Sequence, residues 1–132
     1  SWFYKALAGI NADFSQPGFE KVIIKPHIVE DLTYAGASLK TIRGLIVSRW
    51  WRRGGEALAL EVVIPVNSKG EVHMPTMGLK NPVIEESGRV VWRNGCFIEG
   101  VPGVESGRME DSYVVFNVGS GSYTFSVREE ST

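Results

Sequence analysis

The segment "GLIVSRWWRRGGEALALEVVIP" (residues 44–65) contains two runs of aliphatic, β-branched and aromatic residues separated by a Gly-Gly pair. Every second residue of the run 58–64 is a large aliphatic residue, so these side chains share one face of a strand, and Pro65 ends that strand. Glycines allow the positive φ angles that a tight connection needs, so residues 52–56 are expected to form the connection. The segment therefore predicts a β-hairpin with one buried face.

Trp50 and Trp51 are adjacent in the first of these strands. Successive residues of a strand point to opposite faces, so we expect Trp50 to enter the core and Trp51 to lie on the outer face near Arg49 and Arg53. An outward tryptophan beside arginines could stack on a sugar ring or a base, or carry an arginine over its face. Another domain could equally cover it. We favour packing or interdomain contact over sugar stacking, and sugar stacking over nucleic-acid binding.

The rest of the chain after Pro17 also has the composition of strands. Asn94-Gly95 is a tight-turn signal, and "SYVVFNVGSGSYTFSV" (112–127) predicts a hairpin around residues 119–121. Residues 78–110 are richer in loops. Short strands with Gly and Pro between them predict an all-β fold, an antiparallel β-sandwich with Greek-key or jelly-roll-like connections. Further strand-like runs occupy residues 19–26, 32–40, 70–75 and 89–93.

The segment "WFYKALAGI" (2–10) is the one convincing helical segment. Phe3, Leu7 and Ile10 recur at i, i+4 and i+7, which places them in one apolar stripe. Trp2 lies off this stripe, so the helix is apolar around most of its circumference and should be buried on more than one side. The alternative is that this short N-terminal helix simply caps one end of the sandwich.

Composition narrows the classes of function. The chain has 132 residues, enough for one domain, and its formal net charge of −1 gives no overall field to attract a polyanion. The single cysteine, Cys96, excludes an intramolecular disulfide, and two histidines with one thiol cannot build a closed zinc site without carboxylates. No apolar run is long enough to span a bilayer, and the N-terminus lacks the pattern of a signal peptide. We expect no nucleic-acid or membrane partner.

Neighbouring carboxylates occur at residues 85–86, 110–111 and 129–130, and at 30–31 in a polar loop. Neighbours on a strand point to opposite faces, so none of these pairs converges on a substrate, and we expect all of them to be solvated. Cys96 follows a turn without a catalytic signature and is expected to be a half-buried thiol. "VGSGS" (118–122) resembles a nucleophile elbow only superficially, because no helix follows it.

The two histidines are isolated in the sequence. His27 follows a strand in "KPH", and His73 alternates with Val72 and Met74 in a short strand. A lone histidine in such a position is usually a hydrogen-bonded structural residue or a surface residue. For His27, an interdomain contact is the alternative.

Several motifs, in this order along the chain, resemble bacterial α-L-rhamnosidases. "WFYKALAGINADFSQPGFEKVIIKPH" (2–27) is similar to the junction between the helical barrel of that family and its C-terminal β-sandwich. Residues 44–67 resemble the family's "G-x-I-x-S-x-W … L-x-V-x-I-P-x-N" hairpin, with Trp50 on the family tryptophan. "VHMP" (72–75) and residues 113–127 resemble its later strands. The chain departs from the family at "SKGE" (68–71), where a Thr-x-Ala-like segment is usual, and at Trp51, where a polar or basic residue is usual.

The resemblance implies a parent enzyme that removes terminal α-L-rhamnose from glycosides or polysaccharides by an inverting two-carboxylate mechanism. In the family, the catalytic carboxylates and the rhamnose pocket belong to the barrel, and no position of this chain matches them. The chain would therefore be a non-catalytic accessory domain, with no catalytic residue, cofactor or metal of its own. The implied division is residues 1–16 as the end of the last barrel helix and linker, 17–128 as the β-sandwich, and 129–132 as a disordered tail.

The expected partner is the catalytic (α/α) barrel of the same chain, contacted through Trp2, Phe3, Leu7 and His27. Rhamnose-containing glycans would be bound through the parent, and the isolated fragment could dimerise through its exposed helix. The alternative is a carbohydrate-binding module that uses a platform of Trp51 and Arg49. The compartment stays open between secretion, the periplasm and the cytoplasm of a bacterium.

Overall fold

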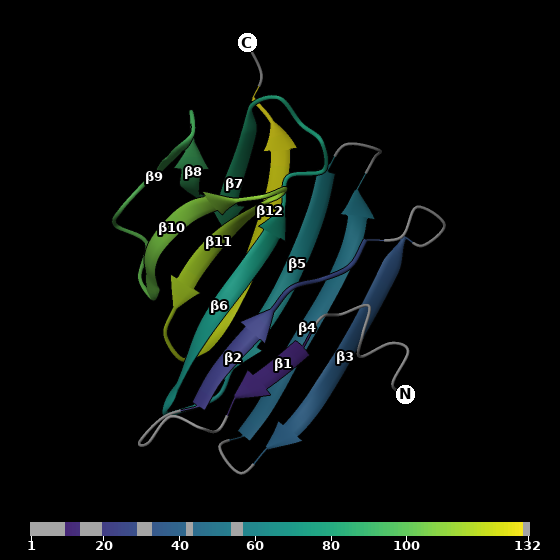
Figure 1. Ribbon diagram of the computed structural model, residues 1–132, viewed down its shortest axis with the longest axis vertical. Helices are drawn as coiled ribbons and strands as arrows, with labels where there is room; N and C mark the ends of the chain where they lie inside the picture. The colour runs from purple at the N-terminus through teal and green to yellow at the C-terminus, as the bar shows by residue number, and fades with distance from the viewer. Residues whose placement is uncertain (1–9, 14–19, 29–32, 42–43, 54–56, 131–132) are drawn as a thin grey trace.

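The computed structural model describes residues 10–13, 20–28, 33–41, 44–53 and 57–130, and these form two β-sheets (Figure 1). The five-stranded sheet has the order β1 (Ile10–Asp13), β2 (Glu20–Ile24), β6 (Ser68–Pro75), β11 (Tyr113–Val118), β10 (Val104–Glu110). The seven-stranded sheet has the order β3 (Tyr34–Thr41), β4 (Gly44–Arg53), β5 (Ala57–Ile64), β12 (Gly121–Glu129), β7 (Pro82–Glu86), β8 (Arg89–Arg93), β9 (Cys96–Phe97). The predicted all-β sandwich is confirmed.

Neighbouring strands are antiparallel except for β2 and β6, which pair in parallel. No described residue lies in a helix, so the described part of the chain has no helix of the length and hydropathy that crosses a membrane.

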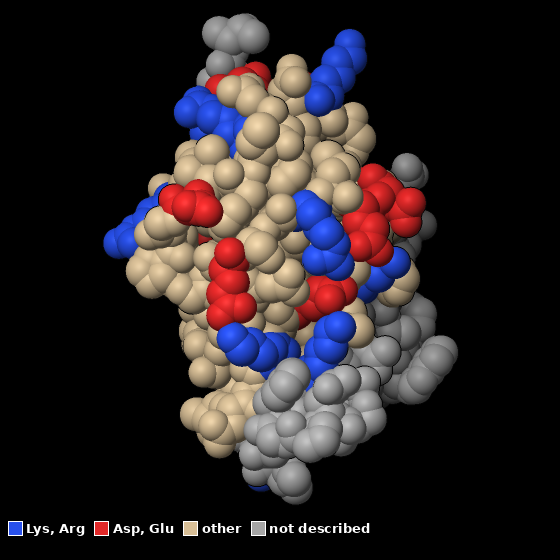
Figure 2. Space-filling model, turned by 60° about the vertical axis from the view of Figure 1, so that its left-hand side comes forward, with Lys and Arg blue, Asp and Glu red and all other residues tan. Residues whose placement is uncertain are grey.

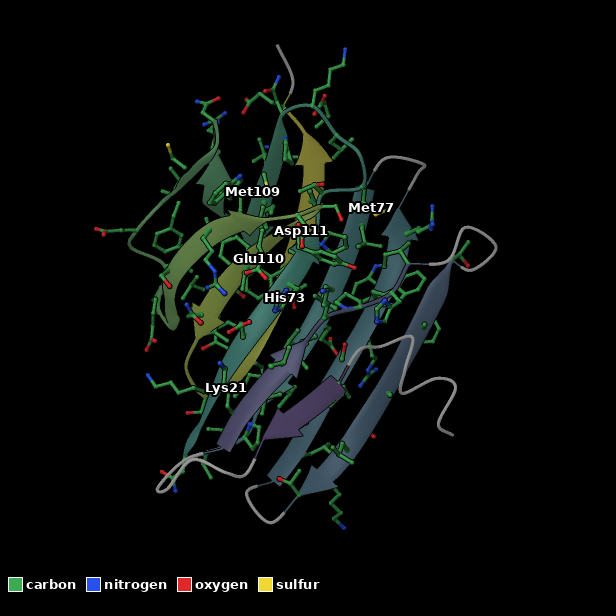
Figure 3. All side chains as sticks on the ribbon, viewed as in Figure 1. Lys21, His73, Met77, Met109, Glu110 and Asp111 are labelled. Carbon is green, nitrogen blue, oxygen red and sulfur yellow. The ribbon has the colours of Figure 1, made fainter. Side chains whose placement is uncertain are left out.

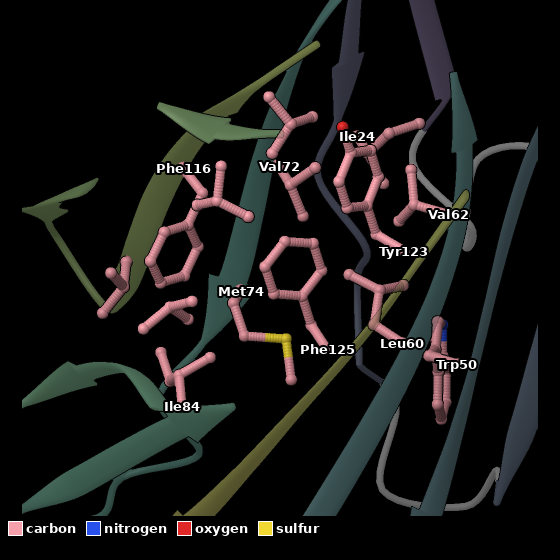
Figure 4. Close-up of a cluster of buried hydrophobic side chains, with 14 of the residues drawn as sticks. Ile24, Trp50, Leu60, Val62, Val72, Met74, Ile84, Phe116, Tyr123 and Phe125 are labelled. Atoms are coloured by element: carbon pink, nitrogen blue, oxygen red, sulfur yellow. The ribbon is translucent and has the colours of Figure 1, made fainter. Parts of the chain in front are cut away.

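The core lies between the two sheets and is filled by the alternate residues that face inward (Figure 4). Phe116 of β11 stacks on Phe125 of β12 with ring centroids 5.3 Å apart, which joins the two sheets at the centre. Close packing of this kind makes each buried side chain sensitive to a change in volume. The largest fully buried side chains are Trp50, Phe116, Phe125, Ile24, Ile46, Leu58, Leu60, Ile64, Met74, Ile84 and Val22.

Strands β4 and β5 form the predicted hairpin, with Trp50 opposite Leu60 and Arg53 opposite Ala57. Trp50 is fully buried, whereas Trp51 is only partly buried on the other face, as the alternation predicts. Strand β4 is longer than expected because Arg52 and Arg53 still belong to it and not to the connection. The two tryptophans are thus confirmed on opposite faces of one strand.

The predicted hairpin of residues 112–127 is wrong. Strand β11 pairs with β6 and β10, whereas β12 pairs with β5 and β7 in the opposite sheet. The connection between them crosses the sandwich, and it is held by a hydrogen bond from Gly119 N to Gly103 O of 2.9 Å. The Tyr123 hydroxyl also donates to Gly119 O, at 2.9 Å. Alternating patterns define strands, but they are the same whether the partner lies beside the strand or across the core.

The structure also differs from expectation at both ends of the described chain. Ile10, expected at the end of the N-terminal helix, begins strand β1, where it lies opposite Ile24 and is buried in the core. Pairing and burial of a β-branched residue outweigh a helical spacing of only three apolar residues. The rest of the expected helix, residues 2–9, lies outside the described residues. Strand β12 includes Glu129, and the Glu130 amide donates to Asn81 O at 2.9 Å, although both were expected in a tail.

The loop-rich segment 78–110 contains strands β7 to β10. The predicted Asn94-Gly95 turn is confirmed between β8 and β9, with φ angles of 53° and 74°. Cys96 follows this turn and is exposed, not half-buried, because β9 is the edge strand of its sheet.

Candidate functional site

The candidate site is a hollow of about 220 Å³ on the outer face of the seven-stranded sheet, over β3 and β4. The antiparallel register places Gly36 opposite Arg49 and Tyr34 opposite Trp51. The strands hold these residues in place because their backbones are paired along the full length of β3. The hollow is lined by Tyr34, Gly36, Ala37, Ser38 and Arg49.

The hollow depends on a glycine. A Cβ atom at residue 36 would lie 2.7 Å from Arg49 Cγ and 3.3 Å from the Tyr34 hydroxyl oxygen. Arg49 therefore crosses the strand directly above the Gly36 backbone. Gly36 is not among the glycines with positive φ, so the position needs glycine for space and not for its backbone conformation.

The charge of Arg49 is balanced within the same face. Arg49 Nε lies 3.5 Å from Glu61 Oε1 of β5, and the side chains are 50% and 38% exposed. A pair this exposed contributes little to folding stability, since water screens both charges. Glu61 itself does not line the hollow, but it lies beside the Arg49 side chain, which does.

The aromatic residue at the hollow is Tyr34, which is 56% exposed. Trp51, the aromatic residue expected from the sequence, is partly buried beside it and does not line the hollow. Arg49 lines the hollow, as the predicted platform of Trp51 and Arg49 requires. The aromatic residue beside it is Tyr34 of β3 and not Trp51. Tyr34 and Gly36 were missed, because only the strand register in the structure places "YAG" (34–36) against "RWW" (49–51).

The other site residues predicted from the sequence are not found at the hollow within the described part of the chain. His27 is exposed just after β2, in the five-stranded sheet, and Trp2, Phe3 and Leu7 lie outside the described residues. The structure thus brings none of these four to the hollow within its described part.

A second polar cluster lies on the outer face of the five-stranded sheet. Glu71 accepts a hydrogen bond of 2.9 Å from His73 and lies 3.5 Å from Lys21 Nζ and 3.7 Å from an Arg108 nitrogen. Figure 3 labels Lys21 and His73, which come from neighbouring strands β2 and β6. Burial raises the pKa of Glu71, but the His73 hydrogen bond and the charges of Lys21, His73 and Arg108 outweigh it and hold this pKa below its ordinary value.

His73 is a structural residue of this cluster, as expected. It is 5% exposed, and its ring meets Tyr113 edge-on with centroids 6.0 Å apart. The Tyr113 hydroxyl donates to Pro26 O at 3.1 Å, Lys25 Nζ lies 5.2 Å from the ring centroid, and burial raises the pKa of Tyr113. The cluster is a set of satisfied interactions that fastens β2, β6 and β11 together.

Among the described residues, the neighbouring carboxylates at 85–86 point to opposite faces of their strand. Glu85 pairs with Arg128 at 3.0 Å, whereas Glu86 points to the opposite face, as predicted. The expectation that Glu86 is solvated is wrong: it is 6% exposed, and it accepts hydrogen bonds from Thr124 N at 3.1 Å and from the Ser87 hydroxyl. The pair 110–111 lies on the exposed surface, and 30–31 lies outside the described residues.

On the face shown in Figure 2, acidic and basic side chains are interspersed. This face therefore has no large positively charged region that would favour a polyanion. Across the described ranges, no group of three or more His, Cys, Asp and Glu side chains could hold a metal ion.

Comparison with known proteins shows that this chain is similar to a part of α-L-rhamnosidases. Residues 9–89 match the family described as the bacterial alpha-L-rhamnosidase C-terminal domain. The alpha-L-rhamnosidase of Streptomyces avermitilis is 31% identical over 126 residues, which is 96% of this chain and 10% of that protein. The alpha-L-rhamnosidase of Formosa agariphila is 37% identical over 75 residues, 57% of this chain and 8% of that protein.

A solved structure, the alpha-L-rhamnosidase from Dictyoglumus thermophilum, superimposes with a TM-score of 0.78 and 34% identity. The match covers 97% of this chain and 13% of that chain. The chain therefore spans about a tenth of the length of the relatives that it matches.

Proposed function

Since the chain belongs to the bacterial α-L-rhamnosidase C-terminal domain family, we propose that it is the non-catalytic accessory sandwich of an α-L-rhamnosidase. The parent enzyme would hydrolyse terminal α-L-rhamnosides by an inverting mechanism with two carboxylates, and the sandwich would pack on its catalytic barrel and stabilise it. The observation that carries the proposal is that a match over nearly the whole chain accounts for only about a tenth of an α-L-rhamnosidase.

The arrangement of the carboxylates supports a non-catalytic role. Inverting hydrolysis needs two carboxyl groups on opposite sides of a sugar, about 6.5–9.5 Å apart, one of them free to donate a proton and the other free to activate water. Glu86 is buried and accepts hydrogen bonds from Thr124 and Ser87. Glu71 interacts with the side chains of Lys21, His73 and Arg108. Both carboxylates are engaged within the sandwich itself.

The proposed contact with the barrel involves His27 and the segment that contains Trp2, Phe3 and Leu7. His27 is exposed directly after β2, so its ring is accessible to another domain. The proposal assigns the segment before residue 10 to the end of the barrel helix. The expected boundary at residues 16 and 17 is moved, because β1 (Ile10–Asp13) pairs with β2 in the five-stranded sheet, and the sandwich extends to Glu129 at the end of β12.

Two measurements test this function. The purified chain should release no aryl group from an aryl α-L-rhamnoside, and measurable turnover by the pure chain would overturn the non-catalytic role. In the parent enzyme, deletion of the sandwich should lower the thermal midpoint of the catalytic domain, because the surface that it covers becomes exposed. An unchanged midpoint would overturn the stabilising role.

A point substitution then locates the contact. His27→Ala in the parent should lower the thermal midpoint of the catalytic domain. Glu99→Ala should not, since Glu99 is also exposed but lies between β9 and β10. Equal effects of the two substitutions would exclude His27 from the contact.

A further inference from the structure

We propose that the hollow over β3 and β4 is a binding subsite for one neutral pyranose ring of a glycan. This inference does not need the barrel contact proposed above, and it concerns the outer face of the other sheet. The volume of the hollow, about 220 Å³, limits the size of the ligand. Drug-sized ligands occupy pockets of roughly 300 Å³ or more, so this hollow accommodates a single ring rather than an oligosaccharide.

The side chains at the hollow supply the two kinds of contact that sugars use. The exposed Tyr34 ring offers an apolar surface to the C–H groups of a pyranose, and its hydroxyl is a hydrogen-bonding group. Arg49 donates hydrogen bonds, and Ser38 both donates and accepts them. An aromatic ring with polar groups beside it can contact both the C–H groups and the hydroxyl groups of one sugar ring.

Charge favours a neutral ligand. Arg49 lies within 3.5 Å of Glu61, so the guanidinium is already compensated and a carboxylate or sulfate group would meet the acidic side chain as well. The interspersed charges and the net charge of −1 give no attraction for a polyanion. A neutral sugar hydroxyl, in contrast, can accept from Arg49 without bringing a second anion close to Glu61.

The site is also positioned before a ligand arrives. Arg49 passes directly over Gly36, where an added Cβ would lie 2.7 Å from Arg49 Cγ and would displace the arginine, and its Nε lies 3.5 Å from Glu61 Oε1. Two paired strands carry the lining residues that the structure describes, so little backbone order has to be gained there on binding. An open single-ring site of this kind binds with a dissociation constant on the order of 1 mM.

The test is a titration of the isotope-labelled chain with methyl α-L-rhamnopyranoside, followed by amide shifts in NMR spectra. Saturable shifts are expected at residues 36–38 and 49, and methyl α-D-glucuronide should bind more weakly. Absence of saturable shifts at these amides, or tighter binding of the glucuronide, would overturn the proposal.

Variants assign the binding to the named side chains. Tyr34→Ala should weaken binding by about tenfold, the loss expected for one aromatic contact. Gly36→Ala should do the same by displacing Arg49, and Arg49→Gln covers the case in which Gly36→Ala fails to fold. Leu45→Ala, an exposed change on the same face outside the hollow, should leave binding unchanged.

Equal binding by the wild type and by both Tyr34→Ala and Arg49→Gln would refute the assignment. This result would leave the proposed accessory role untouched, since that role rests on the thermal stability of the parent enzyme.

Discussion

Gly103 connects the two sheets through contacts at a single residue. Its φ angle is +86°, and its carbonyl accepts the Gly119 amide at the crossing from β11 to β12. A Cβ atom at this position would overlap the Tyr123 hydroxyl and ring. Position 103 therefore needs glycine for two reasons: its φ angle is positive, and Tyr123 leaves no room for a Cβ atom.

Gly103→Ala should lower the free energy of unfolding by more than backbone strain alone, which costs about 1–3 kcal/mol. Gly88 provides the matched control, because its φ is +85° but nothing lies within 4 Å of its added Cβ. Gly88→Ala should show only the strain. Urea denaturation of both variants measures the difference, and equal losses would show that the contact with Tyr123 costs nothing.

The face on which a side chain lies was predictable where it depends only on the alternation within its own strand. Trp50 and Trp51 follow from alternation alone, and so do the buried aliphatic residues of β5. Tyr34 and Gly36 were not predictable in this way, since their role depends on which residues of β4 lie opposite them. Likewise, Glu86 is buried only because the Thr124 amide of β12 is available to it.

Among the elements, β6 carries Glu71, whose ionisation links the stability of its polar cluster to pH. The pKa of Glu71 is lowered in the folded chain, so its charge stabilises the fold above the unfolded value of about 4.3 and this contribution is lost as the pH falls through the folded value. Glu71→Gln should lower stability at pH 7 by about 1 kcal/mol, because a charged hydrogen bond to His73 becomes a neutral one.

Denaturant unfolding at several pH values measures the effect of Glu71. The difference between the wild type and Glu71→Gln should shrink as the pH falls below about 4. Glu110→Gln is the control, since Glu110 is exposed and pairs with Arg108 at 3.2 Å. Its effect should stay below about 1 kcal/mol at every pH, and a pH dependence as large as that of Glu71 would contradict the assignment.

Elements were predictable where local sequence signals define them. The β4–β5 hairpin has glycines between two apolar runs, and the Asn94-Gly95 turn has the residues that its positive φ angles require. The β11–β12 connection carries similar glycines but joins different sheets, because pairing with β5, β6, β7 and β10 stabilises these strands more than a hairpin would. Non-local pairing of this kind leaves no mark in the local sequence.

At the scale of the whole molecule, the sandwich is held together across its core. The sheets share no strand, so their association depends on interdigitating side chains. The fold class was predictable because short apolar runs separated by turns permit few architectures. The order of the strands was not predictable. The parallel pairing of β2 with β6 brings together residues that are 48 positions apart in the chain, such as Glu20 and Ser68.

The stack of Phe116 on Phe125 is the contact that best measures this association, with an interplanar angle of 18°. Phe116→Leu and Phe125→Leu should each lower the free energy of unfolding, because each change leaves a gap in a fully buried position. The double variant should lose less than the sum of the two by about 0.5–1.5 kcal/mol, since the second substitution has no stacking left to remove.

Equilibrium unfolding of the four proteins gives this coupling energy. Phe125→Leu combined with Leu45→Ala is the control cycle, since Leu45 is exposed on the outer face of β4, and its effects should add to within about 0.5 kcal/mol. If the phenylalanine cycle were equally additive, the stack would contribute only its buried area, and the two sheets would be held by the hydrophobic effect without a specific ring contact. A coupling confined to the phenylalanine pair would identify this stack as a specific link between two sheets that pair no strand with each other.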